Sequence, residues 1–133
     1  MRYESLLPET QIGFLGPKGT FAEQALLSEA DLAGTQVRPY DSIPDVLNAL
    51  VTEEVDLGFV PIENAIEGAV NVTQDSIAFD LDLKIHREVV LDVQLDLLAL
   101  PGTKIVDIDT VLSFPVAIAQ CRAFLRERLP AAK

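Results

Sequence analysis

Cysteine and histidine are almost absent from this 133-residue sequence. With one cysteine, Cys121, and one histidine, His86, no internal disulfide forms and no His/Cys cluster is available to hold zinc or iron. No apolar run approaches the roughly 18 residues of a membrane helix, and the first residues lack the apolar stretch of a signal peptide. These absences predict a cytoplasmic protein with no metal site and no membrane partner.

Basic residues are also few, 10 against 21 acidic residues, which gives a formal net charge of −11 at pH 7. Nucleic acids and anionic membranes bind clusters of lysine and arginine, so neither is an expected partner. An anionic ligand would have to be attracted locally by helix N-termini and a few cations. The acidic run 53–56 is interpreted as a solvated helix end, because a hard-cation site needs converging oxygens.

What the sequence does contain is a 49% hydrophobic composition typical of a globular chain. Short apolar runs at 11–15, 36–40 and 56–60 predict strands. Between them, Thr20 and Glu23 fit a capping box ahead of an apolar stripe that continues to Leu32, and Ser42 fits an N-cap with Pro44 in the first helical turn. Strand, helix, strand, helix, strand predicts an α/β fold with a parallel sheet and right-handed crossovers.

The second half of the sequence has a different spacing of apolar residues. A short helix is expected from Asn71 to about Phe79, and alternation of apolar and polar residues over 83–90 and 91–100 predicts β structure. Ser113 is expected to cap a helix over 114–128, in which Cys121 lies on the apolar face as a buried structural thiol. No strand follows that helix, so the second α/β unit is expected to be open, and its exposed strand edges favour a dimer or larger oligomer.

Two segments of the sequence contain the residue types of a binding site, and we call them the first and the second corner. Each joins an expected strand to an expected helix, where an α/β protein presents polar side chains and free backbone N–H groups to a small anion. The first corner is Gly16-Pro17-Lys18-Gly19-Thr20-Phe21, and the second is Val60-Pro61-Ile62-Glu63-Asn64 and its continuation to Asn71.

These corners resemble the prephenate dehydratase family, whose enzymes convert prephenate to phenylpyruvate in phenylalanine biosynthesis. The same order of motifs continues with Ser42-Ile43-Pro44-Asp45-Val46, with Ser113-Phe114-Pro115 and with Ala119-Gln120-Cys121. The resemblance implies a two-lobed α/β fold similar to type 2 periplasmic binding proteins, with the active site in the cleft between the lobes. Residues 1–79 would form the first lobe and residues 80–133 part of a second lobe that is incomplete in this chain.

The resemblance also implies a lyase reaction that needs no cofactor. Loss of carbon dioxide and hydroxide from prephenate makes the ring aromatic, so the protein has to assist departure of the hydroxyl and hold two carboxylates. By resemblance, the catalytic residues are Glu63, Asn64, Ser113 and Gln120. The substrate-binding residues would be Lys18, Gly19, Thr20, Phe21 and Ala65.

Each of these residues also has a plainer interpretation. Thr20 and Ser113 fit simple helix caps, Lys18 a solvated loop cation, and Glu63-Asn64 an ordinary turn in which the asparagine serves the backbone. Gln120 lies seven residues after Ser113, which on one helix would place both on the same face, although surface filler is an alternative. His86, within an expected β run, is interpreted as a strand residue and not as a base.

The sequence departs from the family pattern at Ala65, where serine is usual, at Ala69, where glycine or serine is common, and at Phe114, where histidine is frequent. The family's Thr-Arg-Phe segment and its regulatory ACT domain would lie beyond Lys133. We therefore expect a truncated chain or N-terminal fragment, inactive by itself. Alternatives are a prephenate decarboxylase or arogenate dehydratase on the same scaffold, or a ligand-binding module without catalysis.

Overall fold

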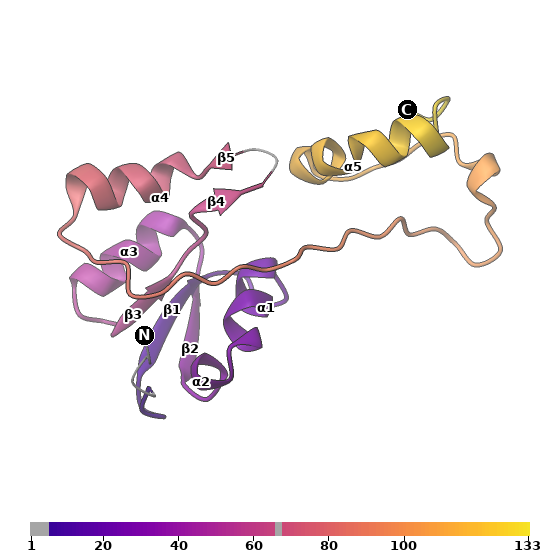
Figure 1. The fold of residues 1–133 in the computed structure, drawn as a ribbon. Coiled ribbons are helices and arrows are strands. Elements are labelled where there is room, and N and C mark those ends of the chain that lie inside the picture. The colour runs from indigo at the N-terminus through magenta and orange to yellow at the C-terminus, as the bar shows by residue number, and fades with distance from the viewer. Residues whose placement is uncertain (1–5, 66–67) are drawn as a thin grey trace. The chain divides into compact units, whose positions relative to one another are not determined.

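The fold is described from a computed structural model, over residues 6–65 and 68–133. Contacts between residues divide the chain into two units. The first unit runs to Asn64 and resumes over Gly68–Asp92, and the second contains Val93–Lys133. Each unit is described by itself (Figure 1).

A three-stranded parallel sheet forms the centre of the first unit, as the sequence predicts. Its strands are β1 (Gln11–Leu15), β2 (Gln36–Tyr40) and β3 (Leu57–Phe59), in the order β2-β1-β3. The register places Ile12 opposite Val37 on one side and opposite Leu57 on the other. Because β1 is central, its apolar residues Ile12 and Phe14 are almost completely buried.

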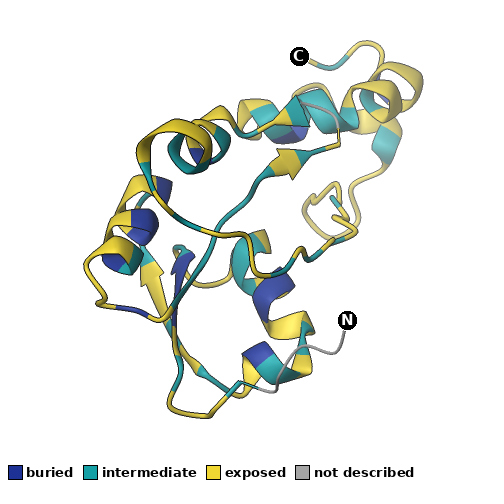
Figure 2. Cartoon of the chain, turned by 60° about the vertical axis from the view of Figure 1, so that its left-hand side comes forward, coloured by how far each residue is buried: buried dark blue, intermediate teal, exposed yellow. Residues whose placement is uncertain are grey.

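Helices cover both faces of this sheet (Figure 1). Helices α1 (Phe21–Ser28) and α2 (Ala30–Ala33) lie on one side, and α3 (Ile43–Val51) lies on the other. Leu26 of α1 and Leu32 of α2 complete a core with the buried residues of β1. Buried residues accordingly gather on β1 and on the helix faces turned toward it (Figure 2).

The predicted continuous apolar helix from Thr20 to Leu32 is interrupted at Glu29, which adopts an extended backbone conformation between α1 and α2. Just before the break, the Ser28 hydroxyl donates a hydrogen bond of 2.7 Å to the Ala25 carbonyl. Such local side-chain bonds compete with the helical ladder. The α3 prediction is confirmed in detail, since the Ser42 hydroxyl accepts a hydrogen bond from the Asp45 amide and Pro44 occupies the first turn.

After β3 the chain forms a small hairpin and a helix. The hairpin strands β4 (Glu63–Asn64) and β5 (Gly68–Ala69) pair antiparallel. Helix α4 (Asn71–Asp75) follows and continues as the π-helical turn η1 (Ser76–Asp80). The short helix expected from Asn71 to about Phe79 is therefore confirmed.

The predicted β structure over 83–100 is wrong. The chain is extended there, but within the described residues no strand forms between Leu81 and Leu100. Alternation of apolar residues gives a segment two faces, yet a strand also needs a neighbouring strand for its N–H and C=O groups, and none of the described strands lies against this segment. The alternation is still visible in how exposed the side chains are. Along the first part of the segment, half-buried residues are separated by exposed ones, and the half-buried residues are Leu81, Leu83, Arg87, Val89 and Leu91.

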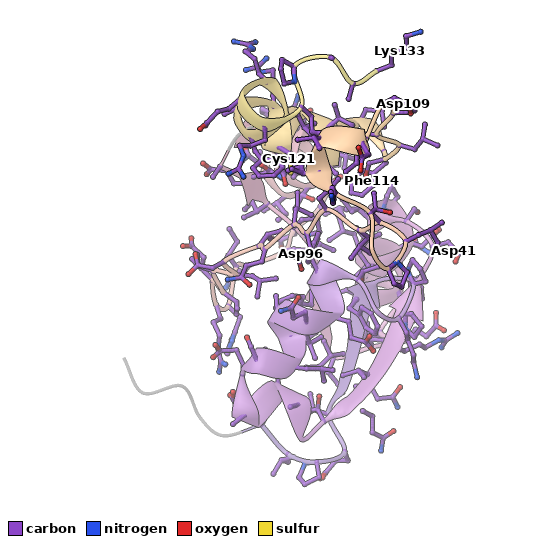
Figure 3. All side chains as sticks on the ribbon, turned by 90° about the vertical axis from the view of Figure 1, so that its right-hand side faces the viewer. Asp41, Asp96, Asp109, Phe114, Cys121 and Lys133 are labelled. Carbon is purple, nitrogen blue, oxygen red and sulfur yellow. The ribbon has the colours of Figure 1, made fainter. Side chains whose placement is uncertain are left out.

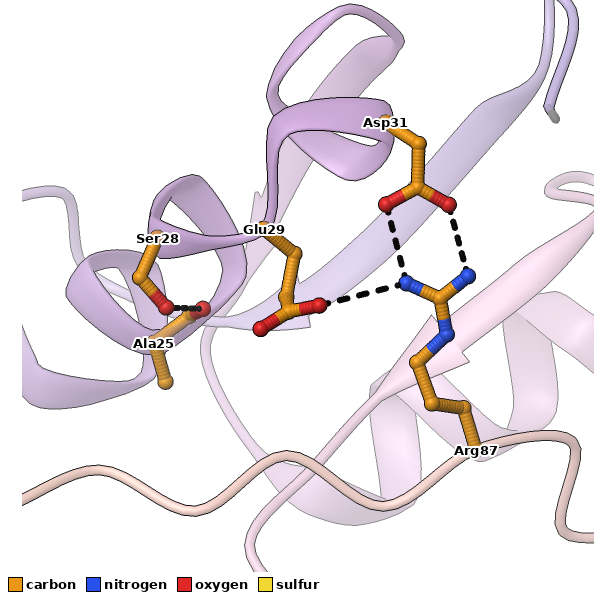
Figure 4. Close-up of polar contacts among 5 residues, drawn as sticks. All are labelled: Ala25, Ser28, Glu29, Asp31 and Arg87. Atoms are coloured by element: carbon orange, nitrogen blue, oxygen red, sulfur yellow. Dashed lines mark hydrogen bonds and ion pairs between the residues drawn. The ribbon is translucent and has the colours of Figure 1, made fainter. Parts of the chain in front are cut away.

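An ion pair within the first unit fastens the start of this extended segment to α2. Arg87, only 10% exposed at its side chain, forms two parallel hydrogen bonds with Asp31 of α2 and a longer contact of 3.5 Å with Glu29 (Figure 4). A bidentate arginine–carboxylate pair combines charge with fixed geometry. His86, the neighbouring residue, is exposed.

The second unit contains the 3-10 turn η2 (Ile105–Asp107) and the helix α5 (Pro115–Arg128). Its last residue returns to the loop before α5: the Lys133 amide donates to the Asp109 carbonyl, and the Val111 amide donates to the Lys133 carbonyl, at 2.9 and 2.8 Å. This reciprocal pattern is that of one rung of a parallel ladder. None of the helices in the described part of the chain is long and apolar enough to cross a membrane.

The predicted cap of α5 is wrong by one residue. Phe114, not Ser113, is the N-cap, and it makes no side-chain capping bond. A residue before proline avoids the helical region, so the extended backbone of Phe114 follows from Pro115, which begins the helix. Ser113 thus lies outside the helix, and its predicted place on one helical face with Gln120 is also wrong. Cys121 is half-buried where a buried thiol was expected.

Candidate active site

The two sequence corners of the first unit lie at the same edge of the sheet. The loop 16–20 follows β1, and residues 60–64 follow β3, which is the parallel neighbour of β1. In the order β2-β1-β3, the connection from β1 leads to one side and the connection from β2 returns to the other. Ligands of open α/β sheets bind at such a switch point, outside the carboxyl ends of the strands. The topology thus supports a site between these corners.

The first corner is held by bonds within the loop. The Gly16 amide donates to the Tyr40 carbonyl at 2.8 Å, which ties the loop to the end of β2. Thr20 is the N-cap of α1 by backbone position, but its hydroxyl donates to the Pro17 carbonyl at 3.0 Å and caps no helical amide. The predicted reciprocal capping box of Thr20 and Glu23 is therefore wrong.

Glu23 instead reaches one residue further back. Its carboxylate accepts a hydrogen bond of 2.5 Å from the Gly19 amide. The negative charge lies at the N-terminus of α1, where the helix dipole favours it. The Gly19 N–H, expected to be open to an anionic ligand, is thus already occupied. Lys18 and Phe21 are exposed beside it.

The second corner is the β4–β5 hairpin. Glu63 is opposite Ala69 and Asn64 is opposite Gly68, whose backbone has a positive φ of 83°. The Glu63 side chain is exposed, Asn64 is half-buried, and Ala65 is exposed directly after it. A carboxylate and an amide thus follow β3 as consecutive residues of β4, whose side chains turn to opposite faces of the strand. Both groups are able to form hydrogen bonds, the carboxylate as an acceptor and the amide as donor and acceptor.

Helix α4 fixes the base of this hairpin. The buried Thr73 hydroxyl donates to the Pro61 carbonyl at 2.7 Å, and the Gln74 side-chain amide donates to the Ile62 carbonyl at 3.2 Å. The helix-compatible pattern of the sequence includes Thr73 but not Gln74, and it predicts no further role for either residue. The available signal was the polar Thr73 among apolar positions such as Val70, Val72 and Ile77.

Ser113 and Gln120 belong to the second unit, so the structure does not bring them together with Glu63 and Asn64 in one described body. Within that unit, a groove of about 830 Å³ lies along α5. Ser113, Phe114 and Cys121 line it, whereas Gln120 does not. Figure 3 labels four of the lining residues: Asp96, Asp109, Phe114 and Cys121. The groove is mainly apolar, and its acidic residues are Asp96, Asp107 and Asp109.

Charge is distributed unevenly along the chain. Residues 1–92 contain 17 of the 21 acidic residues but only five of the ten basic ones. Among acidic groups of the described residues, Asp31 has a clearly displaced pKa: its hydrogen bonds from Arg87 hold that pKa below the ordinary value of 3.8. Over residues 6–65 and 68–133, no group of three or more His, Cys, Asp and Glu side chains is arranged to hold a metal ion.

Comparisons with known proteins agree on one family. A family model described as "Prephenate dehydratase" matches residues 12–133. A prephenate dehydratase of Mycobacterium ulcerans (strain Agy99) is 40% identical over 128 residues, which cover 90% of this chain and 41% of the relative. The prephenate dehydratase of Mycolicibacterium gilvum (strain PYR-GCK) is 42% identical, with 90% and 42% covered.

Solved structures give the same result. The crystal structure of prephenate dehydratase from Arthrobacter aurescens, in complex with L-Phe, matches with a TM-score of 0.77 and 37% identity over 93% of this chain and 40% of that one. The enzyme from Streptococcus mutans matches with a TM-score of 0.51 and 30% identity over 54% of this chain. The chain spans about two fifths of the length of the relatives it matches. The motifs, the parallel sheet and these matches together show that the chain belongs to the prephenate dehydratase family.

Proposed function

We propose that this chain supplies part of the active site of a prephenate dehydratase, which forms phenylpyruvate, carbon dioxide and water from prephenate. The observation that carries the proposal is the position of Glu63 and Asn64 after β3, beside the loop that follows β1, at the switch point of the sheet. Membership of the family supplies the reaction.

The main requirement of the reaction is a set of hydrogen-bond donors around the substrate. As the C1 carboxylate leaves as carbon dioxide, its bonding electrons enter the ring and the C4 hydroxyl departs with a proton as water. A donor near that hydroxyl stabilises the developing charge, and donors near the two carboxylates orient the substrate. We assign the role of donor to Asn64 of the first unit and to Ser113 and Gln120 of the second unit, and a catalytic role also to Glu63, which is next to Asn64 in the sequence.

The loop after β1 serves substrate binding in this proposal. Lys18 provides a cation at the N-terminus of α1, in a part of the sequence where cations are few. Because the Gly19 amide is bonded to Glu23 and the Thr20 hydroxyl donates to Pro17, a substrate carboxylate would be held mainly by the Lys18 cation, with Gly19 and Thr20 shaping the loop around it. Phe21 and Ala65 would border the substrate from the two corners.

We further propose that residues 1–79 and residues 80–133 belong to two lobes similar to those of type 2 periplasmic binding proteins, and that the second lobe is incomplete in this chain. The contacts place residues 80–92 with the first unit, so the boundary of the lobes stays part of the proposal. The single parallel rung at Lys133 and the greater length of the relatives support this. Exposed apolar side chains, among them Val90, Leu98 and Leu112, support self-association as a dimer or larger oligomer. We place the enzyme, a lyase of amino-acid biosynthesis, in the cytoplasm.

The test is formation of phenylpyruvate from prephenate, read by its alkaline absorbance after subtraction of the spontaneous reaction. Two proteins are compared: the 133-residue chain, and a hybrid in which this chain replaces the matching part of the Mycobacterium ulcerans relative. The remaining part of the relative alone is the control. We expect turnover from the hybrid only. A soluble, folded hybrid without turnover would contradict the proposed function.

Ala65 favours two alternative activities on the same scaffold, a prephenate decarboxylase and an arogenate dehydratase. An alanine at this exposed position removes a hydroxyl that the family usually has, and with it one donor or acceptor next to Asn64. A decarboxylase or an arogenate dehydratase on the same scaffold is therefore distinguished by product: a non-aromatic dihydro compound, or phenylalanine from arogenate, in place of phenylpyruvate. Product analysis with prephenate and, in separate reactions, with arogenate as the substrate separates these outcomes.

A further inference from the structure

We infer that Thr73 and Gln74 of α4 are positioning residues for the Glu63–Asn64 hairpin. They touch no reacting atom themselves. Their hydrogen bonds to the two backbone carbonyls just before Glu63 set the direction in which β4 leaves the sheet. The consequence for turnover rests on the proposed function, whereas the consequence for the hairpin does not.

The carbonyls concerned need partners from outside the sheet. β3 ends at Phe59, so Pro61 and Ile62 lie beyond its ladder with β1. Thr73 donates to the Pro61 carbonyl at 2.7 Å, and the Ile62 carbonyl accepts from Gln74 at 3.2 Å and from the Val70 amide at 3.0 Å. A backbone carbonyl that loses its donor away from water is costly.

Burial makes the Thr73 bond more than an ordinary surface contact. Thr73 is 0% exposed and is the one fully buried polar residue in the described part of the chain. A buried hydroxyl finds no water to replace a lost partner, so its bond defines a geometry as well as an energy.

The hairpin depends on this base because it is small. Each of its strands has two residues, and an isolated two-stranded hairpin is at best marginally stable in water. Helix α4 contacts α3, which packs on β1 and β3. The bonds from Thr73 and Gln74 therefore connect the hairpin, through α4 and α3, to the parallel sheet. This connection matters for turnover because displacement of a catalytic group by about 1 Å can cost on the order of 10²-fold in rate.

Two substitutions separate the hydroxyl from the volume of Thr73. Thr73→Val keeps the shape and removes the donor, whereas Thr73→Ser keeps the donor and removes a methyl group. A merely structural role predicts loss in both variants, because both disturb a packed position. A positioning role predicts that the defect follows the hydroxyl. Thr52→Val is the matched control, since the Thr52 hydroxyl donates to the Asn48 carbonyl at the exposed end of α3.

The first readout needs no activity. Hydrogen exchange of the Val70 amide, which donates to Ile62, reports the base of the hairpin in the 133-residue chain. We expect Thr73→Val to speed this exchange about tenfold, the effect of losing one buried hydrogen bond. Thr73→Ser and Thr52→Val should leave it within about twofold of the unchanged chain. Equal exchange in Thr73→Val and the unchanged chain would overturn the inference, whatever the enzyme does.

The second readout is turnover of prephenate by the hybrid protein. We expect Thr73→Val to lower kcat at least about tenfold with little change in KM, and Thr73→Ser to restore it. Faster Val70 exchange with unchanged kcat would overturn the positioning role. A hybrid without any turnover would contradict the proposed function alone, and the exchange result would still decide whether α4 positions the hairpin.

A variant that fails to fold is recognised by loss of protected amides in β1. In that case Gln74→Met replaces Thr73→Val, since Gln74 is half-buried and its removal leaves the Val70 bond to Ile62 in place. For Gln74→Met we also expect faster exchange of the Val70 amide and a lower kcat, with both effects smaller than in Thr73→Val. An unchanged Val70 exchange rate in a folded Gln74→Met variant would count against the inference.

Discussion

Arg87 and Asp31 form a bidentate ion pair, with Nη1 2.9 Å from one carboxylate oxygen and Nη2 2.6 Å from the other. The two residues are far apart in sequence, and the pair joins an otherwise irregular extended segment to α2 (Figure 4). The Arg87 side chain is 10% exposed, so its positive charge is stabilised mainly by these carboxylates and little by water.

Asp31→Asn is expected to loosen the extended segment more than Glu54→Gln does. Loss of the Asp31 charge removes the bidentate partner of a nearly buried guanidinium, whose remaining contact to Glu29 is longer, at 3.5 Å. The control affects the exposed ion pair of Arg38 and Glu54. Limited proteolysis between Leu81 and Asp92 is the measurement. Equal cleavage rates for the two variants would show that the pair does not hold the segment.

The same pair makes stability depend on acid. The pKa of Asp31 is lowered in the folded chain by its bonds from Arg87, so the stabilisation is fully present above the ordinary value of 3.8 and is lost as the pH falls through the lowered folded pKa. Unfolding midpoints of the unchanged chain and of Asp31→Asn should therefore converge as the pH is lowered below 3.8. A difference that stays constant as the pH falls below 3.8 and through the unfolding of the chain by acid would contradict the assignment.

Ser42→Ala should destabilise the first unit by about 1 kcal/mol, because the hydroxyl that accepts from the Asp45 amide caps α3. Urea unfolding measures this difference. Ser28→Ala is the matched control, since its hydroxyl bonds only a carbonyl within α1 and caps no amide. A larger effect at Ser28 than at Ser42 would mean that the cap is not what stabilises α3.

Two glycines are expected to respond oppositely to alanine. A Cβ at Gly16 would lie 2.9 Å from the Pro39 Cβ and 3.1 Å from the Tyr40 carbonyl oxygen, so Gly16→Ala should cost about 1–3 kcal/mol. Gly34, with a helical backbone and no atom nearer than 3.8 Å, should gain about 0.4–1 kcal/mol in Gly34→Ala. Thermal unfolding compares the two. Similar shifts of the unfolding midpoint in the two variants would show that the loop at Gly16 has room for a Cβ atom.

The sequence was sufficient for the parts of the fold whose signals are local. Ile12 and Phe14 lie in a short apolar run that Gly16 ends, and Ser42 with Pro44 is a helix start that needs no distant partner. The break at Glu29 depends on which local hydrogen bond wins, and the failed strand over 83–100 depends on a partner strand. Periodicity carries no information about either.

The candidate site shows the same division. The motifs predicted which residues gather after β1 and β3, and the parallel sheet brings those two corners to one edge. The occupation of the Gly19 amide by Glu23 and the support of Pro61 by Thr73 were not predictable, because each is a contact between a side chain and a chosen backbone group. The helical pairing of Ser113 with Gln120 failed because Pro115 fixes where α5 begins.

The central claim is that Asn64 acts directly in the reaction, and turnover of prephenate by the hybrid protein with Asn64→Ala or Lys18→Ala tests it most directly. We expect Asn64→Ala to lower kcat by about 10²-fold or more, as for removal of a preorganised donor, and Lys18→Ala to raise mainly KM. Both variants should keep protected amides in β1. Equal and small effects of the two substitutions in folded proteins would contradict the assignment of the site.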